Sequence, residues 1–539
     1  MMLEWVQIIG LSTIGIGLLL CYEATAGAGP LVRATRGEVW PKPQAFQRNY
    51  SYMFVRPNHF KFKVTFHTCA ILDKAIERYK KIISAYSNVG GKQLRKWMKS
   101  DPLFHGYLDS LEVYLDTPCE EYPYLNMDEL YSLKIDYGDL ESKALLVSSS
   151  IWGVLRGLET FTQMLTPSIH IRNHLVVNSS LITDFPRFPH RGLLLDTSRH
   201  FEPLSVIFSI LDGMECNKLN VFHWHIVDDQ SFPYQSQIYP GLSEKGAYNP
   251  ITHVYSIEDI QSVIEYARLR GIRVMPEFDT PGHTQSWGLS IPKLLTPCYQ
   301  GGELSGTYGP IDPSRKENYK FVKTLFQEII SVFKDNYIHL GGDEVSFDCW
   351  SSNPNINQYM KDNNISTYEE LESMYIQKVL NYVTNMNANS IVWQEVFQNN
   401  VTIQNDTVVH IWLGNLAQLL EEVTSAGHKA LISECWYLDH LDKSWIDFYK
   451  CEPWNFDGTT EQKKLVLGGE ACMWSEMVDE SNVVSRIFPR ASATAEKLWS
   501  SEDTNVVHSA QGRLEEHYCR MKKRGISAQP PTGPGFCPI

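Results

Sequence analysis

Residues 219–225 read LNVFHWH, an apolar run that ends in polar and aromatic residues. A short run of this kind predicts a strand that is buried on both faces, as in a parallel sheet. Asp228 and Asp229 follow closely, so we expect reactive side chains just past the carboxyl end of this strand.

The same arrangement returns seven more times, in residues 192–196, 272–278, 337–341, 390–395, 408–412, 430–433 and 468–474. Helix-like stretches lie between these runs and include residues 256–270, 318–333 and 368–383. The first opens with Ser256 and Asp259 in the spacing of a capping box. Eight strands that alternate with helices predict an α/β fold, the (β/α)8 TIM barrel. A doubly wound open sheet is the alternative, but no GxGxxG or P-loop motif favours it.

The chain ahead of the barrel has a different pattern. Residues 111–115 and 130–135 alternate like strands, and residues 149–165 have the periodicity of a helix. This pattern predicts a smaller α+β domain over residues 27–187. The prolines of residues 185–189, FPRFP, mark the junction, and we expect the catalytic barrel to span residues 188–539.

Composition narrows the class of partner. The 539 residues are 43% hydrophobic and 20% charged, which is typical of a globular protein. The formal net charge is −14 and no basic stripe occurs, so we expect no nucleic-acid partner.

The N-terminus predicts export. Residues 6–22 are almost wholly apolar, and Ala24-Thr25-Ala26 offers a cleavage site, so residues 1–26 are expected to be a signal peptide. Glu4 and the lack of a basic residue make a signal anchor the alternative. Eleven cysteines and acceptor sequons agree with an oxidising compartment, and we expect the lysosome or secretion. The sequons are at Asn49, Asn178, Asn364, Asn400 and Asn405.

Reactive side chains follow every one of the eight predicted strands. In chain order they are Arg199; Asp228 and Asp229; Asp279 and His283; Asp343 and Glu344; Trp393 and Glu395; Trp412; Tyr437 and Asp439; Trp474 and Glu476. The carboxyl ends of barrel strands meet at one mouth, where TIM-barrel active sites lie. Acids, an arginine, a histidine and several aromatic rings around one mouth predict a carbohydrate pocket.

Residues 338–344, IHLGGDE, form the most specific motif. Two glycines permit close approach at the strand end, and two adjacent carboxylates follow. Like charges this close raise at least one pKa, which suits a general acid. The alternative is structural: Asp343 and Glu344 would only cap the next helix.

Together these motifs resemble glycoside hydrolase family 20. The resemblance is carried by residues 341–344 (GGDE), 223–229 (HWHIVDD), 279–283 (DTPGH) and 469–474 (GEACMW), which occur in the family's order. It is closest to the animal lysosomal β-N-acetylhexosaminidase subunits and extends from the N-terminal domain to residues 535–537 (GFC).

The resemblance implies exo-acting hydrolysis of terminal β-linked GlcNAc or GalNAc, with retention through the substrate's own 2-acetamido group. Glu344 would be the general acid and base, and Asp343 would hold the acetamido N–H. Trp393, Trp412 and Trp474 would wall the pocket. The other implied residues are Tyr437 at the acetamido oxygen, Arg199, Glu476 and Asp439 at the sugar hydroxyls, and Asp228 and His283 in a network that supports Glu344.

A metal hydrolase is the alternative reading of His223-Trp224-His225, because an H-x-H at a barrel strand end can bind metal together with His283 and Asp279. No further histidine completes such a site at a later strand end. We therefore expect satisfied histidines in the barrel, with neither a metal nor a cofactor.

The resemblance also implies disulfides Cys69–Cys119, Cys298–Cys349 and Cys519–Cys537. Cys216, Cys435, Cys451 and Cys472 are left over, and pairing of Cys435 with Cys451 stays open. Cys472 is expected to be a buried thiol.

Two features point to different subunit kinds within the family. The loop at residues 301–304, GGEL, resembles the kind that accepts sulfated sugars, whereas Asp439 resembles the kind that is restricted to neutral sugars. His440 departs from both. The family further implies a homodimer or a heterodimer with a second subunit, and a lipid-presenting activator protein for glycolipid substrates.

Two other functions compete with hydrolysis. The chain could be a sugar-binding barrel without turnover, or a membrane-anchored recognition protein. Intact Asp343, Glu344 and Tyr437 argue against the first, and only the atypical N-terminus supports the second.

Overall fold

The computed structural model describes residues 29–85, 101–137, 142–169 and 171–537. The predicted signal peptide, residues 1–26, lies outside the described residues. Within them, no helix is both long and apolar enough to cross a membrane.

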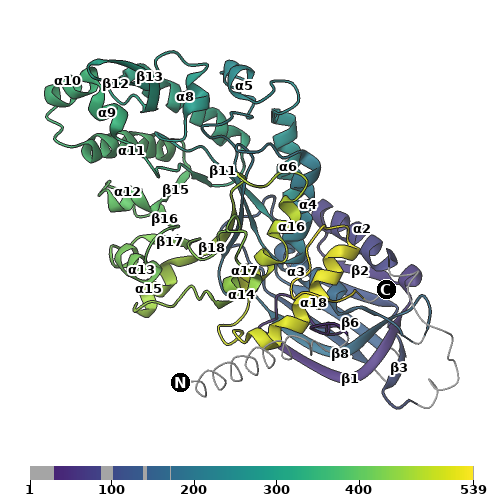
Figure 1. Cartoon of the computed structure of the whole chain (residues 1–539). Coiled ribbons are helices and arrows are strands. Elements are labelled where there is room, and N and C mark those ends of the chain that lie inside the picture. Colours follow the sequence, from purple (N-terminus) through teal and green to yellow (C-terminus); the bar gives the residue numbers. More distant parts are fainter. Residues whose placement is uncertain (1–28, 86–100, 138–141, 170, 538–539) are drawn as a thin grey trace, which may run out of the picture.

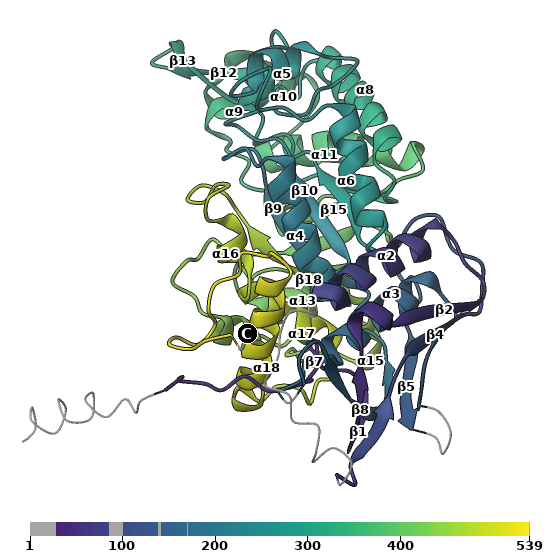
Figure 2. The same ribbon diagram turned by 90° about the vertical axis from the view of Figure 1, so that its right-hand side faces the viewer.

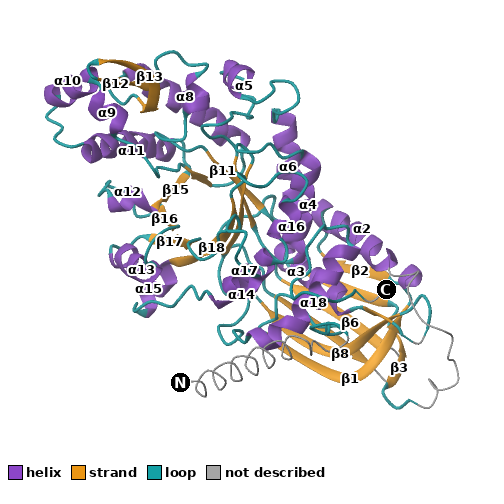
Figure 3. Cartoon of the chain, viewed as in Figure 1, coloured by secondary structure: helices purple, strands orange, loops and turns teal. Residues whose placement is uncertain are grey.

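Eight parallel strands close into a barrel, which confirms the predicted TIM barrel (Figures 1 and 3). In chain order the strands are β9 (His190–Asp196), β10 (Val221–His225), β11 (Arg273–Glu277), β14 (Tyr337–His339), β15 (Asn389–Trp393), β16 (Val408–Ile411), β17 (Lys429–Ile432) and β18 (Val466–Met473). β18 pairs with β9 and closes the ring. All eight predicted strands are present. The fifth ends earlier than predicted, at Trp393, because Gln394 begins a short helix, α12 (Gln394–Gln398).

Helices surround the barrel. The longer ones are α4 (Leu204–Cys216), α6 (Ile257–Arg268), α8 (Lys316–Val332), α11 (Tyr368–Asn385), α13 (Leu416–Ser425), α17 (Arg490–Trp499) and α18 (Val507–Lys523). The predicted capping box opens α6: Ser256 Oγ accepts from the backbone N–H of Asp259, and Asp259 Oδ2 accepts from that of Ser256. Shorter helices lie in the connections: α5 (Gly241–Gly246), α7 (Gln285–Gly288), α9 (Asp348–Ser352), α10 (Pro354–Asp362), α14 (Trp445–Lys450), α15 (Thr460–Leu465) and α16 (Val483–Ile487).

A hairpin of β12 (Leu295–Gln300) and β13 (Glu303–Ile311) projects beyond the barrel (Figure 2). Gly301 and Gly302 form its turn with φ of 62° and 86°, values that favour glycine. The hairpin places the GGEL loop at its tip.

The N-terminal domain is a mixed sheet covered by helices, as the α+β prediction requires (Figure 2). Its strand order is β2-β4-β6-β5-β8-β1-β3, with β7 beside β8. The elements are β1 (Ala45–Val55), η1 (Pro57–His59), β2 (Lys61–Phe66), α2 (Ala70–Ala85), β3 (Phe104–Tyr107), β4 (Ser110–Leu115), β5 (Tyr131–Tyr137), β6 (Ser142–Ser148), α3 (Ile151–Met164), β7 (Thr166–Pro167) and β8 (Leu175–Asp184).

Helix α3 is buried along its whole length, between the sheet and the barrel. Arg156 on this helix donates to the carbonyls of Arg270 and Gly271, which precede β11, and to Glu129 at 2.8 Å. Glu129 also accepts from Arg191 of β9 at 2.6 Å. The two domains therefore share one buried ionic cluster.

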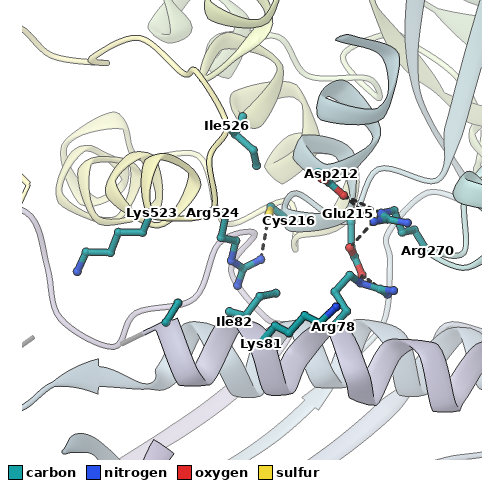
Figure 4. A pocket seen from close by; sticks show the side chains of 11 residues that line it. Arg78, Lys81, Ile82, Asp212, Glu215, Cys216, Arg270, Lys523, Arg524 and Ile526 are labelled. Carbon is teal, nitrogen blue, oxygen red and sulfur yellow. Dashed lines mark hydrogen bonds and ion pairs between the residues drawn. The ribbon is translucent and has the colours of Figure 1, made fainter. Parts of the chain in front are cut away.

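A cavity of about 430 Å³ lies between α2, α4 and the residues after α18 (Figure 4). Its walls are held by ion pairs: Arg78 is 2.6 Å from Glu215, and Arg270 is 2.8 Å from Asp212. Because Arg78 is on α2 and Glu215 on α4, these charges also join the two domains.

Four disulfides are present among the described residues. Three are the pairs that the resemblance implies, Cys69–Cys119, Cys298–Cys349 and Cys519–Cys537. The fourth, Cys435–Cys451, joins the pair that sequence spacing left open. Cys216 and Cys472 are buried thiols.

Candidate active site

Aromatic side chains from the last four barrel strands meet at the mouth. Trp393, Trp412, Tyr437 and Trp474 pack around Cys472 in one cluster. The Trp393 and Trp474 ring centroids are 6.2 Å apart, and those of Trp412 and Tyr437 are 6.1 Å apart. Trp393 is buried and forms the floor, whereas the other three rings are partly exposed. This arrangement provides flat apolar walls for a ring-shaped ligand.

Asp343 and Glu344 lie beside this cluster, at the end of β14. Asp343 is buried, and its Oδ1 has no hydrogen-bond partner among the described residues. The Glu344 side chain is 60% exposed. Glu344 has a φ of 50°, which is rare for a residue with a side chain and is typical of strained functional positions. The turn thus gives two adjacent carboxyl groups different environments.

Asp279 packs against the glycines of the same motif. Its Oδ1 accepts a hydrogen bond from the Gly342 N–H at 2.7 Å. A Cβ at Gly341 would lie only 1.7 Å from Asp279 Oδ1. The glycines therefore permit a close approach at the strand end, as expected, and the group that approaches them is the side chain of Asp279.

Burial and the charge of Asp343 raise the pKa of Asp279 well above its ordinary value. Asp279 and Asp343 are therefore a pair of like charges in which one pKa is raised, and the two residues follow different strands, β11 and β14. The sequence predicts such a pair between the chain neighbours Asp343 and Glu344, and it places Asp279 at a strand end, in the DTPGH motif and in the alternative metal site, but not beside Asp343. The DTPGH motif was the available signal for Asp279.

His283 and Asp228 support these carboxylates from the side. His283 Nδ1 is 3.1 Å from Asp228 Oδ1, and its Nε2 is 3.7 Å from both Asp343 and Glu344. Although burial alone would lower it, the charges of Asp279, Asp343 and Asp228 raise the pKa of His283 well above its ordinary value. His283 is therefore a cation among carboxylates.

Arg199 and Glu476 meet at the rim of the pocket. Arg199 Nη2 is 2.8 Å from Asp228, and Arg199 Nε is 4.0 Å from the half-exposed Glu476. The Arg199 guanidinium lies 5.1 Å from the centroid of the Trp474 ring. Charged donors and acceptors thus stand beside the aromatic walls.

Two further acids at the mouth have raised pKa values. Burial, followed by the charge of Asp343, raises the pKa of Glu395 to about 7, and its carboxylate accepts from Trp412 Nε1 at 3.0 Å. Burial raises the pKa of Asp439 to about 6. Sequence reasoning noticed Glu395 at its strand end but gave it no role.

The histidines of the H-x-H motif have acidic partners inside the barrel. His225 lies 2.7 Å from Glu277 and 2.8 Å from Asp228, and His223 lies 2.7 Å from Glu470. Both ring nitrogens of His225 are thus hydrogen-bonded, whereas His223 Nε2, 3.1 Å from Glu277 Oε2, has no hydrogen-bond partner among the described residues, so the expectation of satisfied histidines holds for His225 alone. Glu277 is a residue that sequence reasoning missed; an acid within an apolar strand was the signal that could have identified it.

The predicted glycosylation sites differ in accessibility. Asn49, Asn364, Asn400 and Asn405 are exposed. The amide of Asn178, on β8, accepts from Arg48 and donates to the carbonyl of Asn49. Glycosylation at all five stays a prediction, and Asn178 is the position where it would disrupt existing contacts.

Known proteins resemble this chain over nearly its full length. A family model described as "Glycosyl hydrolase family 20, catalytic domain" matches residues 188–502, and one described as "beta-acetyl hexosaminidase like" matches residues 39–164. The beta-hexosaminidase subunit alpha of Rattus norvegicus is 47% identical over 512 residues, covering 93% of this chain and 94% of the relative. Subunit beta of Felis catus is 44% identical over 533 residues, covering 97% and 98%.

A solved structure agrees with these sequence relatives. The X-ray structure of Flavobacterium johnsoniae chitobiase matches with a TM-score of 0.79 at 29% identity, covering 91% of this chain and 73% of that one. The catalytic-domain model spans more than half of the chain, and the relatives cover it almost completely. The chain therefore belongs to glycoside hydrolase family 20.

Proposed function

We propose that this chain is an exo-acting, retaining β-N-acetylhexosaminidase that removes terminal β-linked GlcNAc or GalNAc from glycans, glycolipids or chitooligosaccharides. The observation that carries the proposal is the pairing of a buried carboxyl, Asp343, with an exposed one, Glu344, beside a pocket walled by aromatic rings. One carboxyl can hold the substrate while the other exchanges protons with it.

The acetamido group of the substrate supplies the nucleophile in this mechanism. Glu344 donates its proton to the glycosidic oxygen as the bond to the anomeric carbon breaks. The acetamido carbonyl oxygen bonds to that carbon, giving an oxazolinium-like intermediate. Asp343 accepts the acetamido N–H through its free Oδ1 and stabilises the developing positive charge, and Tyr437 donates to the acetamido oxygen. Glu344 then takes a proton from a water molecule whose oxygen bonds to the anomeric carbon while the bond from that carbon to the acetamido oxygen breaks, which restores the acetamido group and leaves the β configuration.

The rim residues account for exo action. Arg199, Glu476 and Asp439 would bind the non-reducing-end hydroxyls, while Trp393, Trp412 and Trp474 enclose the sugar. A clamped terminal sugar leaves no room for a preceding one. His283 and Asp228 would hold Glu344 and Asp343 in place, because the cationic imidazole faces both carboxyl groups.

The test is release of 4-methylumbelliferone from its β-GlcNAc and β-GalNAc conjugates between pH 4 and 7, by wild type and Glu344→Gln. We expect wild-type activity on both conjugates, and a loss of roughly 10²-fold or more in the variant, which cannot donate the proton. A folded wild type without turnover would disprove hydrolysis and favour the sugar-binding barrel.

Tolerance of sulfated substrates depends on Asp439 and His440 in our proposal. His440 is exposed, and its ring centroid is 5.7 Å from that of Tyr437. The exposed His440 imidazole could donate to a 6-sulfate, whereas Asp439 would repel that sulfate when it is ionised. His440→Ala should lower the ratio of sulfated to unsulfated turnover. An unchanged ratio contradicts the idea.

We further propose a dimer in the lysosome or outside the cell, either of this chain alone or with a second subunit. The support is that the relatives are named as alpha and beta subunits. A lipid-presenting activator protein would be needed for glycolipids. Light scattering of the purified chain would give the mass of a dimer or of a monomer.

A further inference from the structure

The buried acid Glu277, beneath the floor of the pocket, joins groups from four barrel strands. Its side chain is fully buried at the end of β11. Glu277 Oε2 is 2.7 Å from His225 Nδ1 and 3.1 Å from His223 Nε2. Glu277 Oε1 accepts from Trp393 Nε1 at 2.8 Å and is 3.1 Å from His339 Nδ1. One carboxylate therefore contacts β10, β14 and β15 from β11.

Charges alternate from Glu277 toward the mouth. Burial opposes ionisation of Glu277, but His339 and His225 hold the pKa of its carboxyl well below the ordinary value. Burial likewise opposes a charged His225, yet Glu277 and Asp228 raise the pKa of His225 to about 10. Glu277 is thus an anion and His225 a cation at every pH at which the enzyme would work.

Asp228 connects His225 to two residues at the pocket, Arg199 and His283. His225 Nε2 donates to Asp228 Oδ2 at 2.8 Å, and Arg199 Nη2 approaches the same oxygen at 2.8 Å. Asp228 Oδ1 is 3.1 Å from His283 Nδ1, whose other nitrogen faces Glu344. A histidine donates from both ring nitrogens only when it is protonated. His225 therefore donates to Glu277 and to Asp228 at the same time only while Glu277 keeps it charged.

We propose that Glu277 is a positioning residue for hydrolysis: it keeps His225 in the form that donates twice, and thereby fixes Asp228 together with Arg199 and His283. It also orients the Trp393 indole at the pocket floor. Glu277 touches no substrate in this scheme. The inference rests on the proposed function, which assigns Arg199 and His283 to the reaction.

The surroundings contain few other charges. The titratable groups that face Glu277 are His223 and His225 from β10, His339 from β14, and Asp279 two residues further along the chain. Those that face His283 are Asp228, Asp229, Asp279, Asp343 and Glu344. Removing the Glu277 charge weakens the cationic state of His225 directly, and a neutral His225 then no longer opposes the protonation of His283 across Asp228.

The test is Glu277→Gln, which keeps the shape of the side chain and removes its charge. A neutral His225 can donate to the amide oxygen of the introduced side chain or to Asp228, but not to both. We expect kcat/KM for the 4-methylumbelliferyl conjugates to fall roughly 10- to 100-fold, the range that displaced catalytic groups cost. The alkaline limb of the pH profile should also move to higher pH, because a neutral His225 no longer repels the proton that His283 holds on the other side of Asp228.

Glu470→Gln is the matched control. Glu470 is equally buried inside the barrel, on β18, and lies 2.6 Å from His190 and 2.7 Å from His223. It has no contact with Asp228 among the described residues. This variant removes the same kind of charge, so it should lose thermal stability like Glu277→Gln while its pH profile stays in place.

Equal pH profiles for the two variants, or equal loss of kcat/KM, would overturn the positioning role. Glu277→Asp keeps the charge and should restore the position of the alkaline limb. This second variant keeps the role testable if Glu277→Gln folds poorly. Wild-type turnover tests the proposed function separately. Should wild type bind without turnover, the pH dependence of N-acetylglucosamine binding in the same variants tests Glu277, and an unshifted profile in Glu277→Gln overturns the role.

Discussion

A single position, Gly341, shows how little space separates the residues of the site. Its φ is 68°, and an added Cβ would lie 1.7 Å from Asp279 Oδ1. Gly341→Ala should therefore lower the free energy of unfolding by roughly 3 kcal/mol or more, combining backbone strain with overpacking. It should also lower kcat/KM, because Asp279 must move away from Asp343. Urea unfolding and turnover measure both effects.

Gly427→Ala separates backbone strain from the clash. Gly427 has a φ of 84°, and a Cβ there would meet nothing within 4 Å. The free energy of unfolding of this variant should fall by only about 1–2 kcal/mol, and its activity should stay unchanged. Equal destabilisation at the two positions would contradict the role of the Asp279 contact.

Residue types at strand ends predicted which side chains the barrel gathers, but not how they pair. Asp343, Glu344, Arg199 and Trp474 could be proposed because each follows a recognisable apolar run. The contact of Asp279 with the glycine turn depends on the register between β11 and β14, which a single sequence does not specify.

At the scale of elements, the loop between β17 and α14 carries Tyr437 and Asp439 and is closed by Cys435–Cys451. Cys435 is two residues from Tyr437. Replacing both cysteines with serine should lower the free energy of unfolding by about 3 kcal/mol, because the disulfide no longer constrains the unfolded chain. It should also raise KM, because the bridge no longer fixes the segment that carries Tyr437. Thermal unfolding and Michaelis–Menten kinetics measure the two effects.

The Cys69–Cys119 pair provides the comparison. It lies in the N-terminal domain, far along the chain from the pocket residues. Its double serine variant should lose stability but keep KM at a temperature where it is folded. A KM that is unchanged in the Cys435 and Cys451 variant would show that the bridge does not position Tyr437.

Regular elements were easier to predict than the connections between them. Apolar runs located all eight barrel strands, but the β12–β13 hairpin was read only as a loop. Its signal was present: Gly301 and Gly302 form the two-residue turn that hairpins favour. Strand ends were less predictable: β14 ends at His339, two residues before the predicted Gly341, and β15 ends at Trp393, because Gln394 begins α12 and its side chain accepts from the N–H groups of Trp412 and Leu413.

For the molecule as a whole, several carboxyl groups ionise less readily after folding. Burial, then the charges of Asp479 and Glu480, raise the pKa of Glu202 to about 8, and burial raises that of Glu372 and Glu395 to about 7. At these carboxyl groups the folded state therefore binds more protons than the unfolded state above about pH 4.3, where free carboxyl groups ionise, and the lowered pKa values of the buried His190, His339, His410 and His517 act in the opposite direction only below about pH 6.5. Stability should fall as pH rises from about 5 to 8.

Calorimetric melting at pH 5 and pH 8 tests this, with Glu202→Gln as the informative variant. Neither oxygen of Glu202 has a hydrogen-bond partner among the described residues. The variant should narrow the difference between the two melting temperatures by raising the one at pH 8. A wild type that melts higher at pH 8 would contradict the assignment.

Helix α3 has a consequence for how this protein could be divided. Every residue of this helix is buried, because the sheet covers one side and the barrel the other. Separating the two domains would therefore expose apolar side chains and the Arg156–Glu129–Arg191 ion pairs to water. Neither half would behave as an autonomous module. The barrel of this chain should not fold stably when it is expressed without the N-terminal domain. Heating should unfold both domains in one cooperative transition.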